Sequence, residues 1–224
     1  TYATGYAAHL AAEEVLAQMV AGMAQVWDVH ENDVNYENAT FTARNNSATF
    51  KEAAALMDQA DILVTGSSSI APNRPGPAIS VQLVDVEVDT ETGKVEILRY
   101  TAAQDAGIAI YPPYVEGQIQ GGVVQGIGWG LNEEYIYNDA GSMTNASFLD
   151  YRMPTALDLP MIETIIVEVP NESHPYGVRG VGEVPIVPPP AALANAIYDA
   201  TGLRLRDLPM SPPRVQQALS ANNG

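Results

Sequence analysis

The amino-acid sequence predicts an α+β fold, in which mixed sheets and hairpins pack against separate helices. Two patterns support this class: apolar side chains recur at helical spacing over residues 7–26, and apolar and polar side chains alternate over residues 79–105. The chain shows no internal repeat, no heptads and no low-complexity tract. With 224 residues, of which 46% are hydrophobic, it is long enough to bury a sizeable core.

The first 78 residues predict one helix and a smaller excursion. Small and apolar side chains follow one face from Ala7 to Val26, and Thr4 with Gly5 is the expected start of that helix. Residues 28–49 are rich in Asn, Asp and Thr, which predicts a small hairpin or an irregular excursion. The stretch "TFKEAAALMDQA" then predicts a short capped helix, and "GSSSIAPNRPGP" predicts a connector.

Residues 79–224 predict a larger core. The stretch "ISVQLVDVEVDTETGKVEILRYTAAQD" predicts two strands joined by a turn. A glycine-rich helix is expected over residues 117–130, and because each glycine costs about 1 kcal/mol against alanine, close approach of a backbone or a bound group must justify them. The segment "ETIIVEVP" predicts a strand with Ile165 and Val167 in phase, followed by a helix over residues 190–200 and a C-terminal tail.

The charge of the chain excludes two classes of partner. The 10 Lys and Arg residues against 27 Asp and Glu residues give a formal net charge of -17, which repels nucleic acid and anionic membrane surfaces. No run approaches the ~20 apolar residues of a membrane span, and no targeting segment is recognisable. We therefore expect a cytoplasmic protein. Because the sequence starts at Thr1, we expect a processed product or a piece of a longer protein.

The sequence contains no cysteine, which excludes disulfides, thiolate catalysis, cysteine-held zinc and iron–sulfur ligation by this chain. His9, His30 and His174 are scattered without the spacing of metal ligands. A metal ion held by protein side chains is therefore not expected, and any redox centre must be held by other means.

Glu183 follows Val181 and Gly182 and precedes an apolar run that begins at Val184. Little in this segment stabilises the charge of Glu183. Desolvation would therefore make its carboxylate more basic, which suits it to act as a general base at neutral pH. The alternative is a structural acid, favoured by the dipole of the helix near residue 190. Spacing alone favours this structural alternative.

The glycine-rich segment carries Gln118, Gln120 and Gln125. Amide side chains beside glycines can reach a polar ligand that approaches the backbone closely, but spacing alone favours tight helix packing. The serines of "GSSSI" could hold a phosphate or line a linker, and no Gly-x-Ser-x-Gly elbow supports a triad hydrolase. A hydrolase that uses Glu183 with Glu133 or Glu134 is the weakest alternative, because nothing in the sequence brings these acids together.

Four segments occur in a recognisable order: "VEVDTETGKVEILRYTAAQDAGIAIYPPYVEGQIQGGVVQGIGWGLNEEYIY", "NASFLDYRMPTALDLP", "GVRGVGEVPIVPPPAALANAIYDATG" and "LRLRDLPMSPPRV". Together they resemble the C-terminal part of the molybdenum-binding subunit of the xanthine dehydrogenase/aldehyde oxidase family of molybdenum hydroxylases. The resemblance covers residues 80–215 closely and the first helix more loosely. It implies the fold of the family's second molybdopterin-binding domain, with residues 1–224 as a C-terminal cofactor-binding portion that comprises residues 1–78 and a core of residues 79–224.

The resemblance implies a role for each matching residue. Glu183 matches the glutamate that removes the proton from the Mo–OH group, whose oxygen comes from water and attacks an electron-poor carbon while hydride passes to the Mo=S sulfur. Gln118 matches the glutamine beside the molybdenum. Gly117, Gly121 and Gly122 match positions that permit close approach of the cofactor.

The resemblance also implies cofactors and partners. A molybdenum-pterin cofactor, as molybdopterin or its cytosine dinucleotide, would hold the metal, and Thr1 and Thr4 are candidates near its phosphate. Fe–S and FAD are expected in partner chains, and the other molybdenum-binding half would complete the pocket for a small-molecule substrate. Aldehyde oxidation and hydroxylation of an N-heterocycle both stay open. The alternative is a non-catalytic structural subunit of such a complex.

Overall fold

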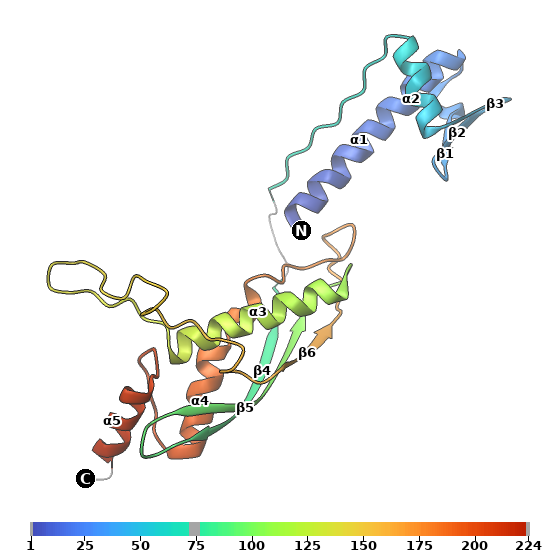
Figure 1. The fold of residues 1–224 in the computed structure, drawn as a ribbon. Helices are drawn as coiled ribbons and strands as arrows, with labels where there is room; N and C mark the ends of the chain where they lie inside the picture. Colours follow the sequence, from blue (N-terminus) through green and yellow to red (C-terminus); the bar gives the residue numbers. More distant parts are fainter. Residues whose placement is uncertain (1, 72–76, 223–224) are drawn as a thin grey trace. The chain divides into compact units, whose positions relative to one another are not determined.

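The computed structural model describes residues 2–71 and 77–222 of the chain. The chain divides into two compact units, Thr1–Arg74 and Pro75–Gly224 (Figure 1). The division lies near the boundary at residue 78 that the sequence predicts.

The first unit begins with a long helix, α1 (Tyr2–Trp27). Thr4 and Gly5 lie inside this helix and do not start it, because helical backbone already includes Tyr2. The predicted excursion is an ordered antiparallel sheet with the strand order β1-β2-β3. Its parts follow one another along the chain: η1 (Glu31–Asp33), β1 (Asn35–Glu37), β2 (Thr40–Ala43) and β3 (Asn46–Thr49).

The predicted short helix is confirmed as α2 (Phe50–Gln59), and a capping box starts it. The backbone N–H of Glu52 donates to the Thr49 hydroxyl at 3.3 Å, and the backbone N–H of Thr49 donates to the Glu52 carboxylate at 2.8 Å. This exchange satisfies N–H groups that the start of a helix leaves unpaired. The hydrogen bonds from the backbone and hydroxyl of Thr49 also hold the pKa of Glu52 below its usual value.

The connector after α2 is bound to α1 within the first unit. The Gln18 amide donates to the Thr65 carbonyl oxygen at 2.9 Å and accepts from the Thr65 N–H at 3.1 Å. The Ser67 N–H donates to the Glu14 carboxylate at 2.8 Å. Because a carboxylate already occupies this N–H, the serine-rich segment is a poor phosphate site and fits the linker alternative. Its described part, residues 66–71, contains no helix or strand.

The second unit is built on a sheet with the strand order β4-β5-β6. The predicted hairpin is confirmed, since β4 (Ser80–Val88) and β5 (Val95–Asp105) pair antiparallel. The third strand, β6 (Ile162–Val167), pairs with β5 in parallel. Parallel neighbours need a crossover connection, and the whole segment from residue 106 to residue 161 provides it.

The strand β6 turns apolar residues to both faces. Ile165 and Val167 share one face, as the sequence predicts, but this face is open, with 47% and 41% of these residues exposed. Ile162 and Ile166 point to the other face and pack toward the core. A continuous apolar run is typical of a parallel strand, so its buried face cannot be chosen from alternation alone.

Helices α3 (Pro112–Leu131) and α4 (Pro189–Thr201) pack against each other and cover one face of the sheet (Figure 1). Both helices confirm elements that the sequence predicts. The core between them and the sheet is formed by fully buried side chains from all three parts: Tyr100, Ile119, Val123, Leu193 and Ile197.

The predicted C-terminal tail is wrong, because it contains helix α5 (Pro212–Asn222). Val215 and Leu219 of this helix are buried in the core of the second unit. Two buried residues one turn apart give only a weak apolar stripe, which is why the sequence pattern does not reveal the helix. The prolines at its start are typical of a first helical turn.

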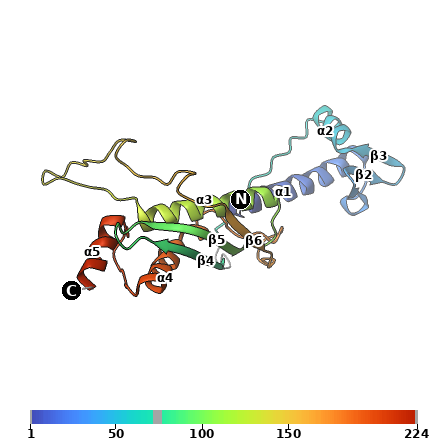
Figure 2. The same cartoon turned by 60° about the horizontal axis from the view of Figure 1, so that its bottom comes forward.

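Residues 132–161 form a long excursion that reaches away from α3 before the chain enters β6 (Figures 1 and 2). The buried Asn145 fixes the base of this excursion. Its Oδ1 accepts from the Ile136 N–H at 2.9 Å, and its Nδ2 donates to the Glu134 carbonyl oxygen at 2.6 Å. Phe148 and Leu149, farther along, are exposed.

Glycines of α3 form a stripe against the segment of residues 184–193. A Cβ added at each would overlap a neighbouring side-chain atom: it would lie 2.4 Å from Pro185 Cγ at Gly122, 2.6 Å from Pro189 Cγ at Gly126 and 2.8 Å from Leu193 Cδ1 at Gly130. No side chain fits at these distances. The missing side chains therefore let η2 (Val184–Ile186) and α4 pack directly on the backbone of α3.

Replacing Gly126 with alanine is expected to destabilise the protein, because the new Cβ would lie 2.7 Å from the Ile186 carbonyl oxygen. Overpacking of this kind costs about 1–3 kcal/mol. Gly121→Ala is the matched control on the same helix, since its Cβ would meet nothing within 4 Å. It should stabilise by up to about 1 kcal/mol, because alanine is the better helix former. Urea unfolding measures both, and equal stabilities would contradict the packing argument.

Candidate functional site

Glu183 lies in the loop that precedes η2, and its side chain is exposed. It makes no capping hydrogen bond, and α4 begins only at Pro189, so the structural alternative of a helix-end acid gains no contact to support it. With Ile79, Val184 and other residues Glu183 lines a cavity of about 540 Å³. The apolar neighbours that the sequence predicts are present, but in this chain by itself they do not desolvate the carboxylate.

The segment before the loop is joined to the end of β5. Gly107 and Val178 form an antiparallel bridge, and the Arg179 N–H donates to the Ala106 carbonyl oxygen at 3.0 Å. Gly107 has a φ of +64°, in the left-handed region, and a Cβ there would lie 2.4 Å from the Gly177 carbonyl oxygen. Only glycine fits this junction.

A largely buried ion pair reinforces the same junction. Arg179 Nε lies 2.9 Å from Asp105 Oδ2, and the two side chains are only 12% and 11% exposed. The Nε–H group is not aligned for a hydrogen bond, so the contact is one of charge. The other oxygen of Asp105 accepts from the backbone N–H groups of Gly107 at 2.9 Å and Val169 at 3.3 Å. Arg179 Nη1 also donates to the Pro77 carbonyl oxygen at 3.2 Å.

The segment after Glu183 is bound to the sheet by a second polar contact. The Gln82 Nε2 group donates to the Pro185 carbonyl oxygen at 2.9 Å. The Gln82 Oε1 atom accepts from the Tyr100 hydroxyl at 2.6 Å. Tyr100 is fully buried, and burial raises its pKa, so its hydroxyl stays protonated as a donor to Gln82.

Gln118 lies beside the Glu183 loop. A Cβ added at Gly182, the residue before Glu183, would lie 3.5 Å from Gln118 Nε2. The fold therefore brings together the two segments that the sequence analysis singles out, one from α3 and one from the loop before η2. An amide and a carboxylate-bearing loop side by side can bind a polar group and accept a proton from it.

The glycines around Gln118 divide into two kinds. A Cβ at Gly117 or Gly121 would meet nothing within 4 Å, so the backbone of α3 is open on this side. Gly122 faces Pro185 instead, and its missing side chain is explained by packing. Gln125, one turn beyond Gly121, is also exposed. Tight packing thus explains Gly122, whereas Gly117 and Gly121 leave space in which a ligand could approach the helix.

Other candidates of the sequence analysis lie elsewhere. Thr4 is exposed on α1 in the first unit, and Thr1 lies outside the described residues. Gln120 donates to the Ile162 carbonyl oxygen at 3.4 Å and is thus engaged within the fold. Among the described residues, no group of three or more His, Asp or Glu side chains is placed to hold a metal ion. In the same part of the chain, no helix is long and apolar enough to cross a membrane.

Glu133 and Glu134 have partners of their own. The Tyr151 hydroxyl donates to Glu133 at 2.7 Å, which raises the pKa of Tyr151 to about 12, and Glu134 pairs with Arg214. Both acids follow the C-terminal end of α3, whereas Gln118 lies near its start, about 20 Å away at 1.5 Å of rise per residue. The structure gives no support to a hydrolase that pairs them with the Glu183 loop.

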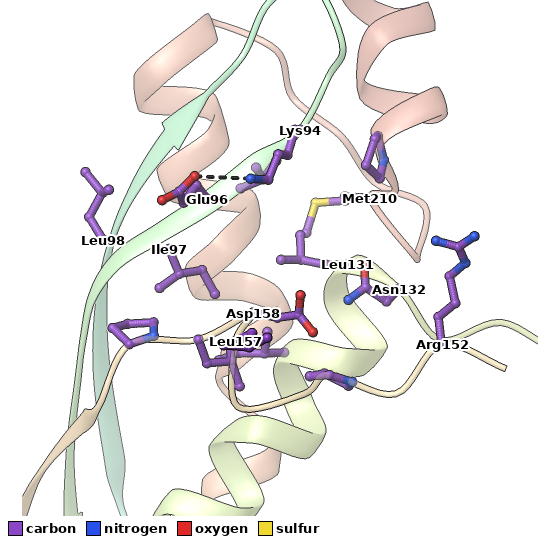
Figure 3. Close-up of a pocket in the computed structure, with 16 residues that line it drawn as sticks. Lys94, Glu96, Ile97, Leu98, Leu131, Asn132, Arg152, Leu157, Asp158 and Met210 are labelled. Atoms are coloured by element: carbon purple, nitrogen blue, oxygen red, sulfur yellow. Dashed lines mark hydrogen bonds and ion pairs between the residues drawn. The ribbon is translucent and has the colours of Figure 1, made fainter. Parts of the chain in front are cut away.

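The C-terminal end of α3 borders a separate cavity of about 620 Å³ (Figure 3). Ile97, Leu131 and Met210 give it apolar walls, and the charged groups of Lys94 and Glu96 at its edge pair at 3.2 Å. None of the predicted site residues lines this cavity. It is therefore distinct from the candidate site.

Gln82, Tyr100 and Asp105 support the candidate site, and none of the three is among the residues predicted from the sequence. A signal for Gln82 exists, because it occupies the inward phase of β4 that Val84 and Val86 share. A polar side chain in that phase needs a hydrogen-bond partner. No such signal identifies Tyr100 or Asp105, whose partners lie far away in the sequence.

A sequence model of the molybdopterin cofactor-binding domain matches residues 1–160, which include Gln118 and end before Glu183. The putative xanthine dehydrogenase molybdenum-binding subunit of Escherichia coli (strain K12) is 39% identical over 155 residues, which are 69% of this chain and 21% of that subunit. The nicotine 6-hydroxylase large subunit of Paenarthrobacter nicotinovorans is 43% identical over 136 residues, or 59% of this chain and 17% of that subunit. This chain thus spans about a fifth of the length of these relatives.

The fold has close counterparts among solved structures. The crystal structure of the Cu,Mo-CO dehydrogenase superposes with a TM-score of 0.77 at 26% sequence identity. The match covers 98% of this chain and 29% of that one. The similarity therefore extends over both units.

Replacing Gly107 with alanine is expected to disrupt the junction before the Glu183 loop. Its positive φ and the 2.4 Å approach to the Gly177 carbonyl oxygen should together cost about 2–4 kcal/mol of stability. Gly180→Ala is the control in the loop itself, because its Cβ would meet nothing within 4 Å and should change stability by less than about 0.5 kcal/mol. Thermal unfolding compares the two, and equal midpoints would contradict the strained junction.

Proposed function

Because this chain belongs to the molybdopterin cofactor-binding domain family, among the molybdenum-binding subunits of molybdenum hydroxylases, we propose that it takes part in such catalysis with Glu183 as the general base. The observation that carries the proposal is the approach of Gln118 Nε2 to Gly182, beside Glu183. The assembled enzyme would oxidise an aldehyde or hydroxylate an N-heterocycle with oxygen from water.

The residues around Glu183 fit a molybdenum-pterin cofactor. Gly117 and Gly121 leave the backbone of α3 bare next to Gln118, so a large group can approach it closely. The Gln118 amide offers that group both a donor and an acceptor. The pterin, as molybdopterin or its cytosine dinucleotide, brings its own ligands for the metal, so this chain needs no set of metal-binding side chains.

In this proposal, Glu183 is the proton acceptor. When bound, the cofactor supplies the redox chemistry that transfers oxygen to an electron-poor carbon and takes up two electrons. The Glu183 carboxylate accepts the proton that this chemistry releases, and Gln118 orients the reacting group through its amide. A general base works best with a pKa near the operating pH. Ile79 and Val184 beside Glu183 would provide the required desolvation once the cavity is closed.

We propose that partners complete the site. The carboxylate of Glu183 is exposed in this chain, and an open cavity would admit water and weaken the interactions in it. The other molybdenum-binding half would close the cavity, and chains with Fe–S and FAD would accept the electrons. The designation of one relative as a large subunit fits such an assembly.

Replacing Glu183 with glutamine keeps the shape of the side chain but removes the base. Turnover of the assembled enzyme should fall by about 10²–10⁴-fold, while molybdenum and pterin per complex stay stoichiometric. Glu172, an exposed acid that precedes the same loop, is the matched control, and Glu172→Gln should keep full turnover. Full turnover in Glu183→Gln would contradict the assignment of Glu183 as the general base. A complex that lacks molybdenum and pterin altogether would instead support a structural subunit.

Enlarging Gly121 tests whether the open side of α3 receives the cofactor. Gly121→Leu places a branched side chain where nothing lies within 4 Å of an added Cβ, so the fold should tolerate it. Bound pterin, measured after its release from the purified complex, should fall strongly in Gly121→Leu and less in Gly121→Ala. Full occupancy in the leucine variant would show that the cofactor does not approach this part of the helix.

A further inference from the structure

The Glu183 side chain has no hydrogen-bond or ion-pair partner within the described residues 2–71 and 77–222. Its direction is therefore set by the backbone of its loop. The loop from Gly180 to Val184 includes two glycines, which have the largest conformational freedom of any residue. Something outside the loop must restrict it if the loop is to stay beside Gln118.

The chain is held on both sides of this loop. On one side, Arg179 carries the charge contact to Asp105, and its own backbone N–H donates to the Ala106 carbonyl oxygen at 3.0 Å. Asp105 cannot move with Arg179, because two backbone N–H groups fix its other oxygen. The position of residue 179 is thus locked to the end of β5.

On the other side, the Pro185 carbonyl oxygen accepts from Gln82, which in turn accepts from Tyr100. The Pro185 ring also lies against Gly122 of α3. The end of the loop is thus held between β4, β5 and α3. Among the described residues, the hydrogen bond from Gln82 to the Pro185 carbonyl oxygen is the one by which Tyr100 and Gln82 are linked to this segment.

We propose that Asp105–Arg179 and Tyr100–Gln82 are two pairs of positioning residues that hold the Glu183 loop beside Gln118. This inference rests on the proposed function. Burying an ion pair costs desolvation and adds little net stability, but it defines one arrangement of the chain where an apolar contact would allow several. The uncharged hydrogen bonds from Tyr100 to Gln82 and from Gln82 to Pro185 likewise define one position for residue 185. Together they restrict a loop that would otherwise sample many conformations.

The test uses the complete enzyme with Arg179→Met, Arg179→Lys and Gln82→Met. Arg179→Met and Gln82→Met should lower kcat by about 10- to 100-fold, since a small displacement of a reacting group has this effect. KM and molybdenum content should stay unchanged. Arg179→Lys keeps the charge beside Asp105 and should retain most of the turnover. Arg99→Met is the control, because it removes an exposed ion pair with Asp85, at 2.8 Å and with side chains 73% and 53% exposed, from the same sheet.

A second readout does not depend on catalysis. In the molybdenum-free enzyme, the amides of residues 180–184 should exchange hydrogen faster in Arg179→Met and Gln82→Met than in the wild type, Arg99→Met or Glu183→Gln. Wild-type exchange and wild-type kcat in both anchor variants, Arg179→Met and Gln82→Met, would overturn the inference. If Arg179→Met does not fold, Gln82→Met decides. If Glu183→Gln stays active while the anchor variants exchange faster, the base assignment fails and the anchoring of the loop stands.

Discussion

The second unit depends on the places where α3 has no side chains. Gly122, Gly126 and Gly130 let Pro185, Pro189 and Leu193 reach the backbone of the helix. This contact fixes η2 and α4 at once and thereby decides where the loop before η2 can lie. Larger residues at the same positions would push both elements outward, and the Glu183 loop would lose its place beside Gln118. The glycines of this helix are thus as much a part of the site as the side chains that line it.

Much of the fold could be predicted because its signals are local. The β4–β5 hairpin follows from alternation, α2 from its capping box, and α3 and α4 from their spacing. Helix α5 could not be predicted, because its two buried residues, Val215 and Leu219, find their partners only in the assembled core. Which face of β6 is buried could not be predicted either, since both faces of an apolar run can pack against a core.

The candidate site could be predicted only in part. Gln118 and Glu183 are visible in the sequence as unusual polar residues among glycines and apolar side chains, but their approach to each other depends on tertiary packing. A resemblance to a family, not their spacing, joined them before the structure did. Asp105 and Tyr100 could not be recognised at all, because the role of a buried polar residue depends on its partner. The partner of Asp105 is Arg179 and that of Tyr100 is Gln82, and both lie far away in the sequence.

The parallel pairing of β5 with β6 has a consequence for the order in which the molecule assembles. The pairing of these strands closes a loop that contains every residue from 106 to 161, including α3 and its long excursion. Contacts across so many residues close slowly, because the entropy of the loop is lost before the pairing compensates it. The Glu183 loop lies beyond β6 in the sequence, so its contact with Gln118 closes a second loop of similar length. A cofactor that contacts both segments can therefore bind only after these distant parts of the chain have come together.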